Sequence, residues 1–253
     1  MKYIDVHTHL TDNRIDVKAL YKELLDSTIV VNSGYDYSST LLSHELAKTY
    51  SNSYFTCGLH PNELKGDYNA FLQKIKDICQ DKKCLAVGEC GLDYHYSPEQ
   101  KNEQKRVFIE QIKLADELNL PLVIHSRECI SDMLNIIEEY KSYLNNGILF
   151  HCFSDSGEIA KVLLKYNSYF SFGGVITFKN AKKEKVLSCI PIERVLSETD
   201  SPYMSPEPFR GQLNTSKNIP IIVEKMANIY NISHEEMKSR LFTNAQDFYR
   251  VKF

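Results

Sequence analysis

Histidine and carboxylate side chains follow several short apolar runs along this 253-residue chain. The first of these runs, KYIDV at 2–6, leads directly into His7 and His9. Side chains two residues apart on a strand point to the same side, so both imidazoles can face one bound ion. Taken alone, such an HxH pair is more often just two polar residues at a strand edge.

The same combination of an apolar run and a metal-binding residue type returns later in the chain. The residues concerned are Glu89, His125, His151 and Asp200. A carboxylate that faces an interior must be paired or bind a cation, because burying a free charge is costly, and a carboxylate can also bridge two cations. Imidazoles and carboxylates bind Zn²⁺ and similar ions, and carboxylates also suit Mg²⁺ and Mn²⁺. The sequence therefore predicts a metal site made by His7, His9, Glu89, His125, His151 and Asp200.

Eight short runs rich in Val, Ile, Phe or Leu are the predicted β-strands. They lie at 2–6, 28–32, 54–58, 85–89, 121–125, 147–151, 168–172 and 194–198. Helical patterns fill the gaps and follow the last strand, at 17–26, 40–50, 68–79, 99–118, 130–144, 157–166, 180–190, 217–230 and 233–249. This alternation predicts an α/β protein, a TIM (β/α)8 barrel in a single domain over 1–253, with the metal site at the C-terminal ends of the strands.

The composition limits the classes of function. With a formal net charge of −3, the chain has no general positive field to attract nucleic acid, so such binding needs a local patch or metal ions. The seven cysteines include no CxxC pair and are interpreted as small apolar residues in a reducing compartment. The first residues are charged, and no run approaches the roughly 18 apolar residues of a membrane span. A cytoplasmic protein is expected.

Several motifs, taken in order, resemble the TatD family of metal-dependent deoxyribonucleases. The most specific are GECGLDY at 88–94 and ETDSP at 198–202. Others are HTH at 7–9, GLHP at 58–61, HSR at 125–127 and HCFS at 151–154, so the resemblance covers nearly the whole chain. It implies a barrel of the amidohydrolase-like superfamily with a two-metal site.

Carried over by position, the resemblance also implies roles for individual residues. One ion would be held by His7, His9, Glu89 and Asp200. The second would be held by Glu89, His125 and His151, with Glu89 shared. The substrate phosphate would be surrounded by His60, Tyr94, Arg127 and Arg210. The chain departs from the family after Arg210, where the family's NEP reads Asn214-Thr215-Ser216.

The family implies hydrolysis of phosphodiester bonds in DNA, at single strands or ends, with trimming from the 3′ end. Two divalent ions, zinc, magnesium or manganese, would activate the attacking water. Asp200 is the candidate to accept its proton, and Glu89 the candidate to bridge the ions. No membrane and no obligate protein partner are expected.

Two alternatives stay open at this point. The first is an amidohydrolase-type enzyme for C–N or ester bonds, such as an aminoacyl-tRNA deacylase or a lactonase, which would have a similar metal face. Many such enzymes bridge their metals with a modified lysine late in the barrel, whereas no lysine ends a predicted strand here. The second is a non-catalytic, metal-binding scaffold, although no predicted ligand is missing.

Overall fold

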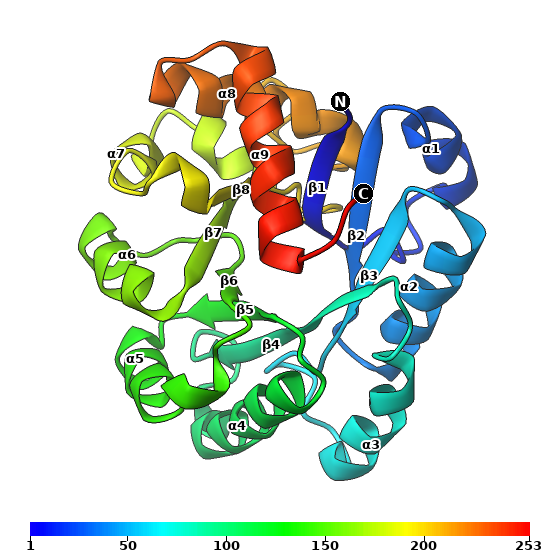
Figure 1. Cartoon of the computed structure of the whole chain (residues 1–253), viewed down its shortest axis with the longest axis vertical. Helices are drawn as coiled ribbons and strands as arrows, with labels where there is room; N and C mark the ends of the chain where they lie inside the picture. Colours follow the sequence, from blue (N-terminus) through cyan, green and yellow to red (C-terminus); the bar gives the residue numbers. More distant parts are fainter.

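Eight parallel strands form the centre of the computed structural model, which describes all residues 1–253. The strands are β1 (Tyr3–Thr8), β2 (Thr28–Ser33), β3 (Ser53–Cys57), β4 (Cys84–Asp93), β5 (Leu122–Arg127), β6 (Ile148–Phe150), β7 (Ser168–Phe172) and β8 (Val195–Ser197). Each strand pairs with its neighbour in the sequence, in the order β1 to β8 (Figure 1). The predicted (β/α)8 barrel is confirmed.

The helices surround this sheet and lie close to the predicted segments. They are α1 (Val17–Leu24), α2 (Tyr37–Thr49), α3 (Tyr68–Ile78), α4 (Lys101–Glu117), α5 (Ile130–Glu139), α6 (Gly157–Leu163), α7 (Lys183–Leu187), α8 (Ile219–Tyr230) and α9 (His234–Tyr249). Short 3-10 turns occupy Pro98–Gln100, Lys141–Tyr143, Leu164–Tyr166, Gly174–Thr177, Ile192–Arg194 and Ser216–Asn218. None of the helices combines the length and the apolar character that a membrane crossing requires.

Side-chain caps explain where several helices begin. The Asp36 carboxylate accepts a hydrogen bond from the Ser39 amide at 2.7 Å, which satisfies one of the free N–H groups at the start of α2. Ser233 caps α9 in the same way, through the amide of Glu236 at 3.2 Å. The run at 233–236 (SHEE) thus begins α9 where the helix at 233–249 was predicted to start.

The strand β4 differs from its prediction in a way that matters for the site. The apolar run was expected to end at Glu89, but β4 continues to Asp93. The pairing of β4 with β5 shifts register between Val87 and Cys90, and such an irregularity changes the direction of the side chains beside it. Glu89 therefore sits within a strand, and Asp93 takes its place at the strand end.

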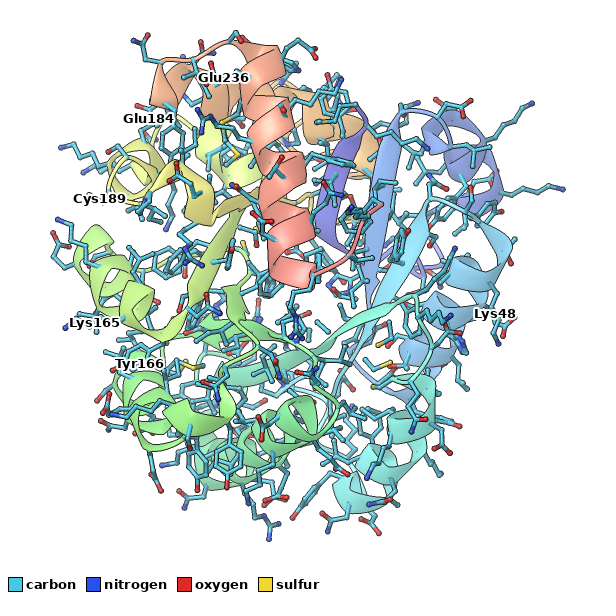
Figure 2. The ribbon with its side chains drawn as sticks, viewed as in Figure 1. Lys48, Lys165, Tyr166, Glu184, Cys189 and Glu236 are labelled. Atoms are coloured by element: carbon cyan, nitrogen blue, oxygen red, sulfur yellow. The ribbon has the colours of Figure 1, made fainter.

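The interior of the barrel is apolar and closed at one end. Side chains from the strands, such as Val31, Val123 and Leu196, pack there with Phe248 and Tyr249 of α9. Figure 1 shows α9 lying across that end of the barrel, while charged side chains such as Lys48, Lys165 and Glu184, labelled in Figure 2, lie at the periphery. The opposite end, where the strands finish, is left for polar residues.

A buried carboxylate, Asp5, closes the seam between β8 and β1. It accepts hydrogen bonds from the Thr199 amide at 2.8 Å and from the Ser216 hydroxyl at 2.6 Å. Burial raises the pKa of Asp5 to about 6, while these hydrogen bonds favour its charged form. This network fixes the turn after β8 beside β1, which brings Asp200 close to His7.

Candidate metal centre

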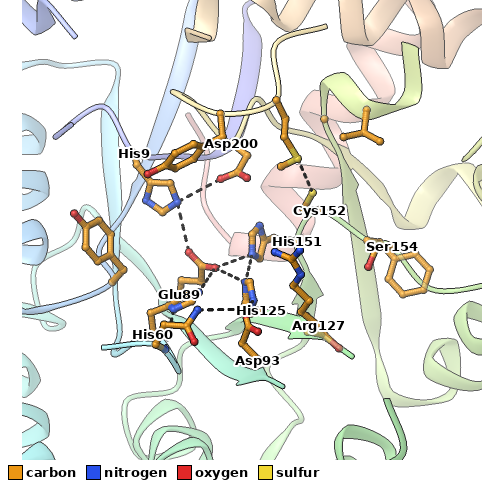
Figure 3. A pocket seen from close by; sticks show the side chains of 18 of the residues that line it. His9, His60, Glu89, Asp93, His125, Arg127, His151, Cys152, Ser154 and Asp200 are labelled. Atoms are coloured by element: carbon orange, nitrogen blue, oxygen red, sulfur yellow. Dashed lines mark hydrogen bonds and ion pairs between the residues drawn. The ribbon is translucent and has the colours of Figure 1, made fainter. Parts of the chain in front are cut away.

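A cavity of about 810 Å³ opens at the C-terminal ends of the strands. Five of the six predicted ligands line it, as Figure 3 shows: His9, Glu89, His125, His151 and Asp200. The sixth, His7, lies fully buried beneath them. Side chains from β1, β4, β5 and from the turns after β1, β6 and β8 thus meet at one point, as the sequence predicts.

Glu89 lies at the centre of this group, and its two oxygens face different partners. Oε2 is 3.2 Å from Nε2 of His7 and 3.5 Å from Nε2 of His9. Oε1 is 2.8 Å from Nε2 of His151 and 3.0 Å from Nδ1 of His125. Burial raises the pKa of Glu89, but the surrounding histidines, His151 foremost, outweigh burial and hold it well below its usual value. Glu89 is therefore a carboxylate shared between two sets of donors.

The first set, here called the β1 set, consists of His7, His9 and Asp200. Nδ1 of His9 lies 3.1 Å from the Ser33 carbonyl and must donate to it, which leaves Nε2 without a proton in the neutral ring. Nδ1 of His7 is 2.9 Å from the Ser33 hydroxyl. Asp200 Oδ1 is 3.4 Å from Nε2 of His9. Because both rings are held from behind, their free nitrogens converge with Asp200 on Glu89 Oε2.

The second set, here called the β5–β6 set, consists of His125 and His151. Nε2 of His125 is 3.0 Å from Asp93 Oδ2 and donates to it, so Nδ1 faces Glu89. Nδ1 of His151 has no hydrogen-bond partner, and Oε1 of Glu198 lies 3.9 Å from it. One ring of this set is therefore held from behind and the other is not.

Asp93 is a site residue that the sequence analysis missed. Burial would raise its pKa, but hydrogen bonds from His125 and from the Tyr96 amide outweigh burial and lower the pKa. It belongs to the GECGLDY run and lies four positions after Glu89. Alternation along a strand puts such positions on one side, so the signal was available once β4 was known to continue.

The chemistry of these donors fits a divalent cation. Burial lowers the pKa of His9, but the carboxylates of Asp200 and Glu89 outweigh burial and raise it to about 9. The same balance, with Asp93 and Glu89 as the carboxylates, raises the pKa of His125 to about 9. In each set a proton must therefore occupy a gap between acceptor atoms. A divalent cation in that gap replaces the proton as the source of positive charge and takes the nitrogen and oxygen donors it prefers.

His60, predicted to contact the substrate, lies beside the ligands. Its Nε2 is 3.3 Å from Glu89 Oε1, and its Nδ1 accepts a hydrogen bond from the Asn62 amide at 3.1 Å. Burial lowers the pKa of His60, so its ring is neutral, and we assign its proton to Nε2. A protonated nitrogen cannot bind a metal. His60 is thus a hydrogen-bond donor at the cavity wall.

The other predicted substrate contacts separate into two groups. Arg127 lines the cavity, with its guanidinium 4.6 Å from the centre of the Tyr96 ring (Figure 3). Tyr94 does not line the cavity, because its side chain turns away from the barrel mouth and its hydroxyl donates to Asp132 of α5 at 2.7 Å. Arg210 is also outside, exposed on the loop after β8 with its guanidinium 4.4 Å from the Phe178 ring. The structure therefore does not bring Tyr94 or Arg210 to the site.

A lysine of α7 also lies in the cavity. Lys183, the first residue of α7, lines the cavity, and its ammonium donates to the Ser154 carbonyl at 2.6 Å. The helix predicted at 180–190 is shorter in the structure, where α7 begins at Lys183 and ends at Leu187. The cavity wall thus holds two cationic side chains, those of Arg127 and Lys183.

Left-handed backbone occurs at one proposed ligand and directly after another. Asp200 has a φ of 51°, and Cys152, directly after His151, has a φ of 44°. Such conformations cost roughly 1–3 kcal/mol and persist only when their surroundings hold them. The Asp200 amide donates to the His7 carbonyl at 3.0 Å, and the Cys152 amide donates to Glu198 at 2.7 Å. Burial raises the pKa of Glu198 to about 8.

The departure from the family after Arg210 leaves a supporting residue in place. Asn214 is fully buried, and its amide nitrogen donates to the Thr199 carbonyl at 2.8 Å and to the Tyr203 carbonyl at 2.7 Å. These two carbonyls flank Asp200. The side chain that remains from the family's motif therefore stabilises the turn that carries a ligand.

Known proteins match this chain over nearly its whole length. Residues 4–250 match the family model described as TatD related DNase. The metal-dependent hydrolase YabD of Bacillus subtilis is 37% identical over 254 residues, with 98% of each chain covered. The metal-dependent hydrolase YcfH of Escherichia coli is 33% identical over 248 residues, which cover 94% of this chain and 91% of the relative.

A solved structure shows the same fold. The crystal structure of YjjV, a TatD homologue from Escherichia coli, superposes with a TM-score of 0.92 at 25% identity, and the match covers 99% of this chain and 98% of that one. The full-length family match, the two relatives and the buried histidines and carboxylates lead to one conclusion. The chain belongs to the TatD-related deoxyribonuclease family and is a metal-dependent hydrolase.

Proposed function

We propose that this enzyme hydrolyses phosphodiester bonds at the ends of single-stranded DNA, with two divalent cations held on either side of Glu89. The observation that carries this proposal is that Oε1 and Oε2 of Glu89 face two separate sets of donors. Zinc, magnesium and manganese all accept these ligand types. When bound, such ions make water a better nucleophile and offset the charge of the phosphate.

Asp200 is positioned to take the proton of the attacking water. Burial raises its pKa, but the hydrogen bond from His9 outweighs burial and lowers it, so the carboxylate is ionised at neutral pH. It lines the cavity and is held by its own backbone hydrogen bond to β1. An ionised, fixed carboxylate at this place is a general base for a water molecule in the cavity.

His60 and Arg127 are positioned to bind the phosphate. The protonated Nε2 of His60 donates to one non-bridging oxygen, and the guanidinium of Arg127 binds another. Neither residue is needed to hold a cation. Their replacement should therefore weaken substrate binding and turnover while leaving the metal content unchanged.

The size and lining of the cavity support the end of a DNA strand as the substrate. A cavity of about 810 Å³ is of the size that encloses a small ligand, so a chain end fits it better than a continuous duplex. Exposed rings of Tyr96 and Tyr203 lie at its edge and suit stacking on unpaired bases. Trimming from the 3′ end rests on the family alone.

The test is a nuclease assay with oligonucleotides of defined ends. Purified protein is given Mg²⁺, Mn²⁺ or Zn²⁺ with single-stranded DNA labelled at the 5′ or the 3′ end, with duplex DNA, and with RNA. The proposal expects stepwise shortening of single-stranded DNA that stops in the presence of a chelator. His234→Ala, which changes a histidine remote from the cavity, is the matched control and should retain activity. Activity that survives the chelator would refute the metal-dependent mechanism.

A second candidate is hydrolysis of ester or C–N bonds by the same centre. The apolar part of the cavity wall, with Phe153, Val175 and Ile176, favours it, because a small apolar substrate would also fit there. No strand places a lysine among the lining residues to bridge the metals, which favours the nuclease. Lactone and amide substrates in the same assay separate the two. A metal-loaded protein that is inactive on the whole panel would point to a scaffold.

A further inference from the structure

Three buried cysteines lie together outside the catalytic cavity. Cys57 ends β3, Cys79 directly follows α3, and Cys84 begins β4. Their sulfur atoms all lie within 4.8 Å of one another, and the Sγ atoms of Cys57 and Cys84 are 3.7 Å apart. Each side chain is nearly inaccessible, and none of the three lines the cavity. Three elements thus direct thiols at one point in the layer between the sheet and α3.

The other buried cysteines of the chain behave differently. Cys90 donates its thiol to the Val123 carbonyl at 3.6 Å, and Cys129 donates to the Leu92 carbonyl at 3.3 Å. Each lies outside the trio and uses the backbone as its partner. In the trio, the Cys84 thiol lies 3.7 Å from the Ala86 carbonyl and also 3.7 Å from the sulfur of Cys57, so it has a sulfur neighbour that Cys90 and Cys129 lack. Ordinary packing of small apolar residues does not require three sulfurs to face one another.

The spacing of the sulfurs suits one central ion. Metal–thiolate bonds of about 2.3 Å place three sulfurs around an ion roughly 4 Å apart. The observed separations, 3.7 Å for one pair and no more than 4.8 Å for the others, are close to that distance. Small rotations of the side chains are therefore enough to bring all three into contact with one ion.

The surroundings decide which kind of ion fits. All three cysteines are buried within the main apolar cluster, where an uncompensated negative charge is disfavoured. The nearby Lys83 does not offset such a charge, because its ammonium donates to the carbonyls of Ala47 and Tyr50. Three thiolates around a monovalent or divalent ion would leave net negative charge in this apolar layer. A trivalent ion leaves none.

We propose that Cys57, Cys79 and Cys84 form a binding site for a trivalent thiophilic centre, of which arsenic(III) is the type. Binding of arsenous acid breaks three S–H and three As–OH bonds, forms three As–S bonds and releases three water molecules. No electrons are transferred, and the product is neutral. The connection between Cys79 and Cys84, residues 80–83, has exposed side chains at Gln80 and Lys82 and gives a short route from solvent.

The experiment uses the whole reduced protein with sodium arsenite, followed by native mass spectrometry and X-ray absorption at the arsenic edge. One arsenic atom should bind per chain, with a mass gain of arsenic less three hydrogens and with three sulfur neighbours. Cys57→Ser, Cys79→Ser and Cys84→Ser should each weaken binding at least tenfold. Cys189→Ser is the matched control, since Cys189 follows α7, on the other side of the barrel from α3 (Figures 1 and 2), and it should bind as the unaltered protein does.

X-ray absorption at the arsenic edge, measured on the unaltered protein, counts the sulfur neighbours without depending on how well the variants fold. A site with fewer than three sulfur neighbours, or no bound arsenic, would overturn the proposal. Tighter binding of copper(I) than of arsenite, lost in the same three variants, would overturn the assignment of a trivalent centre.

Discussion

The two sets of donors around Glu89 differ in how firmly hydrogen bonds hold their side chains. In the β1 set, Ser33 holds His7 and His9 from behind, and the backbone of β1 holds Asp200. In the β5–β6 set, one ring is held by a carboxylate, and Nδ1 of His151 has no partner. Donors that are held before binding lose less entropy when they bind. We therefore infer a tighter cation at the β1 set and a more adjustable one at the β5–β6 set.

The largest effect is expected at the residue that both sets share. Glu89→Ala removes the carboxylate between them, so turnover should fall by roughly 10³-fold or more and metal content should fall at both sets. The measurements are kcat/KM and the metal bound per chain. Glu128→Ala is the matched control, because Glu128 is exposed and pairs only with His95. Near-normal turnover in Glu89→Ala would refute the shared role.

Removing one ligand from each set should separate the two cations. His9→Ala should abolish the tighter binding phase in a calorimetric metal titration, and His151→Ala should abolish only the weaker one. Activity of His151→Ala should return at high metal concentration, since its remaining donors are intact, whereas His9→Ala should recover far less. Equal losses in both phases from either change would show that the sets are not independent.

Residues behind the ligands should give smaller effects of the same kind. Partners that orient metal-binding histidines typically contribute about 10–100-fold in metal affinity. Ser33→Ala should therefore weaken only the tighter phase, through the ring of His7. Asp93→Asn should weaken only the weaker phase, through His125. These two predictions are contradicted if Ser33→Ala weakens the weaker phase and Asp93→Asn weakens the tighter one.

Metal binding should weaken as the pH falls. Without a cation the pKa values of His9 and His125 are raised to about 9, so both rings carry a proton at neutral pH. Each cation must displace about one proton, and its affinity should drop up to tenfold for each pH unit below 9. Calorimetry in two buffers of different ionisation enthalpy counts the released protons. Affinity that stays constant between roughly pH 6 and pH 8 would argue against this assignment.

The fold was predictable because parallel strands covered on both faces appear in the sequence as continuous apolar runs. The strand bounds agree closely, with one informative exception at β4. Its extension to Asp93 depends on a register shift against β5, which is a property of the pairing and leaves no periodic signal in the sequence. The short α7 is the second exception, because the helix predicted at 180–190 is longer than the one that forms at Lys183–Leu187.

The positions of the six proposed ligands were predictable for a related reason. The end of an apolar strand fixes where a side chain emerges, and residues two apart share a side. Beyond the strand ends this rule stops, which is why Tyr94 and Arg210 were expected at a cavity that they do not reach. The division of Glu89 between two sets also depends on side-chain rotation, which spacing does not encode.

The central claim is that Glu89 holds a cation at each of its two oxygens. Anomalous X-ray diffraction from crystals grown with Mn²⁺ or Zn²⁺ tests this most directly. The account predicts two peaks, one among His7, His9 and Asp200 and the other between His125 and His151, with Glu89 in contact with both. A single peak, or a second ion that does not touch Glu89, would contradict it.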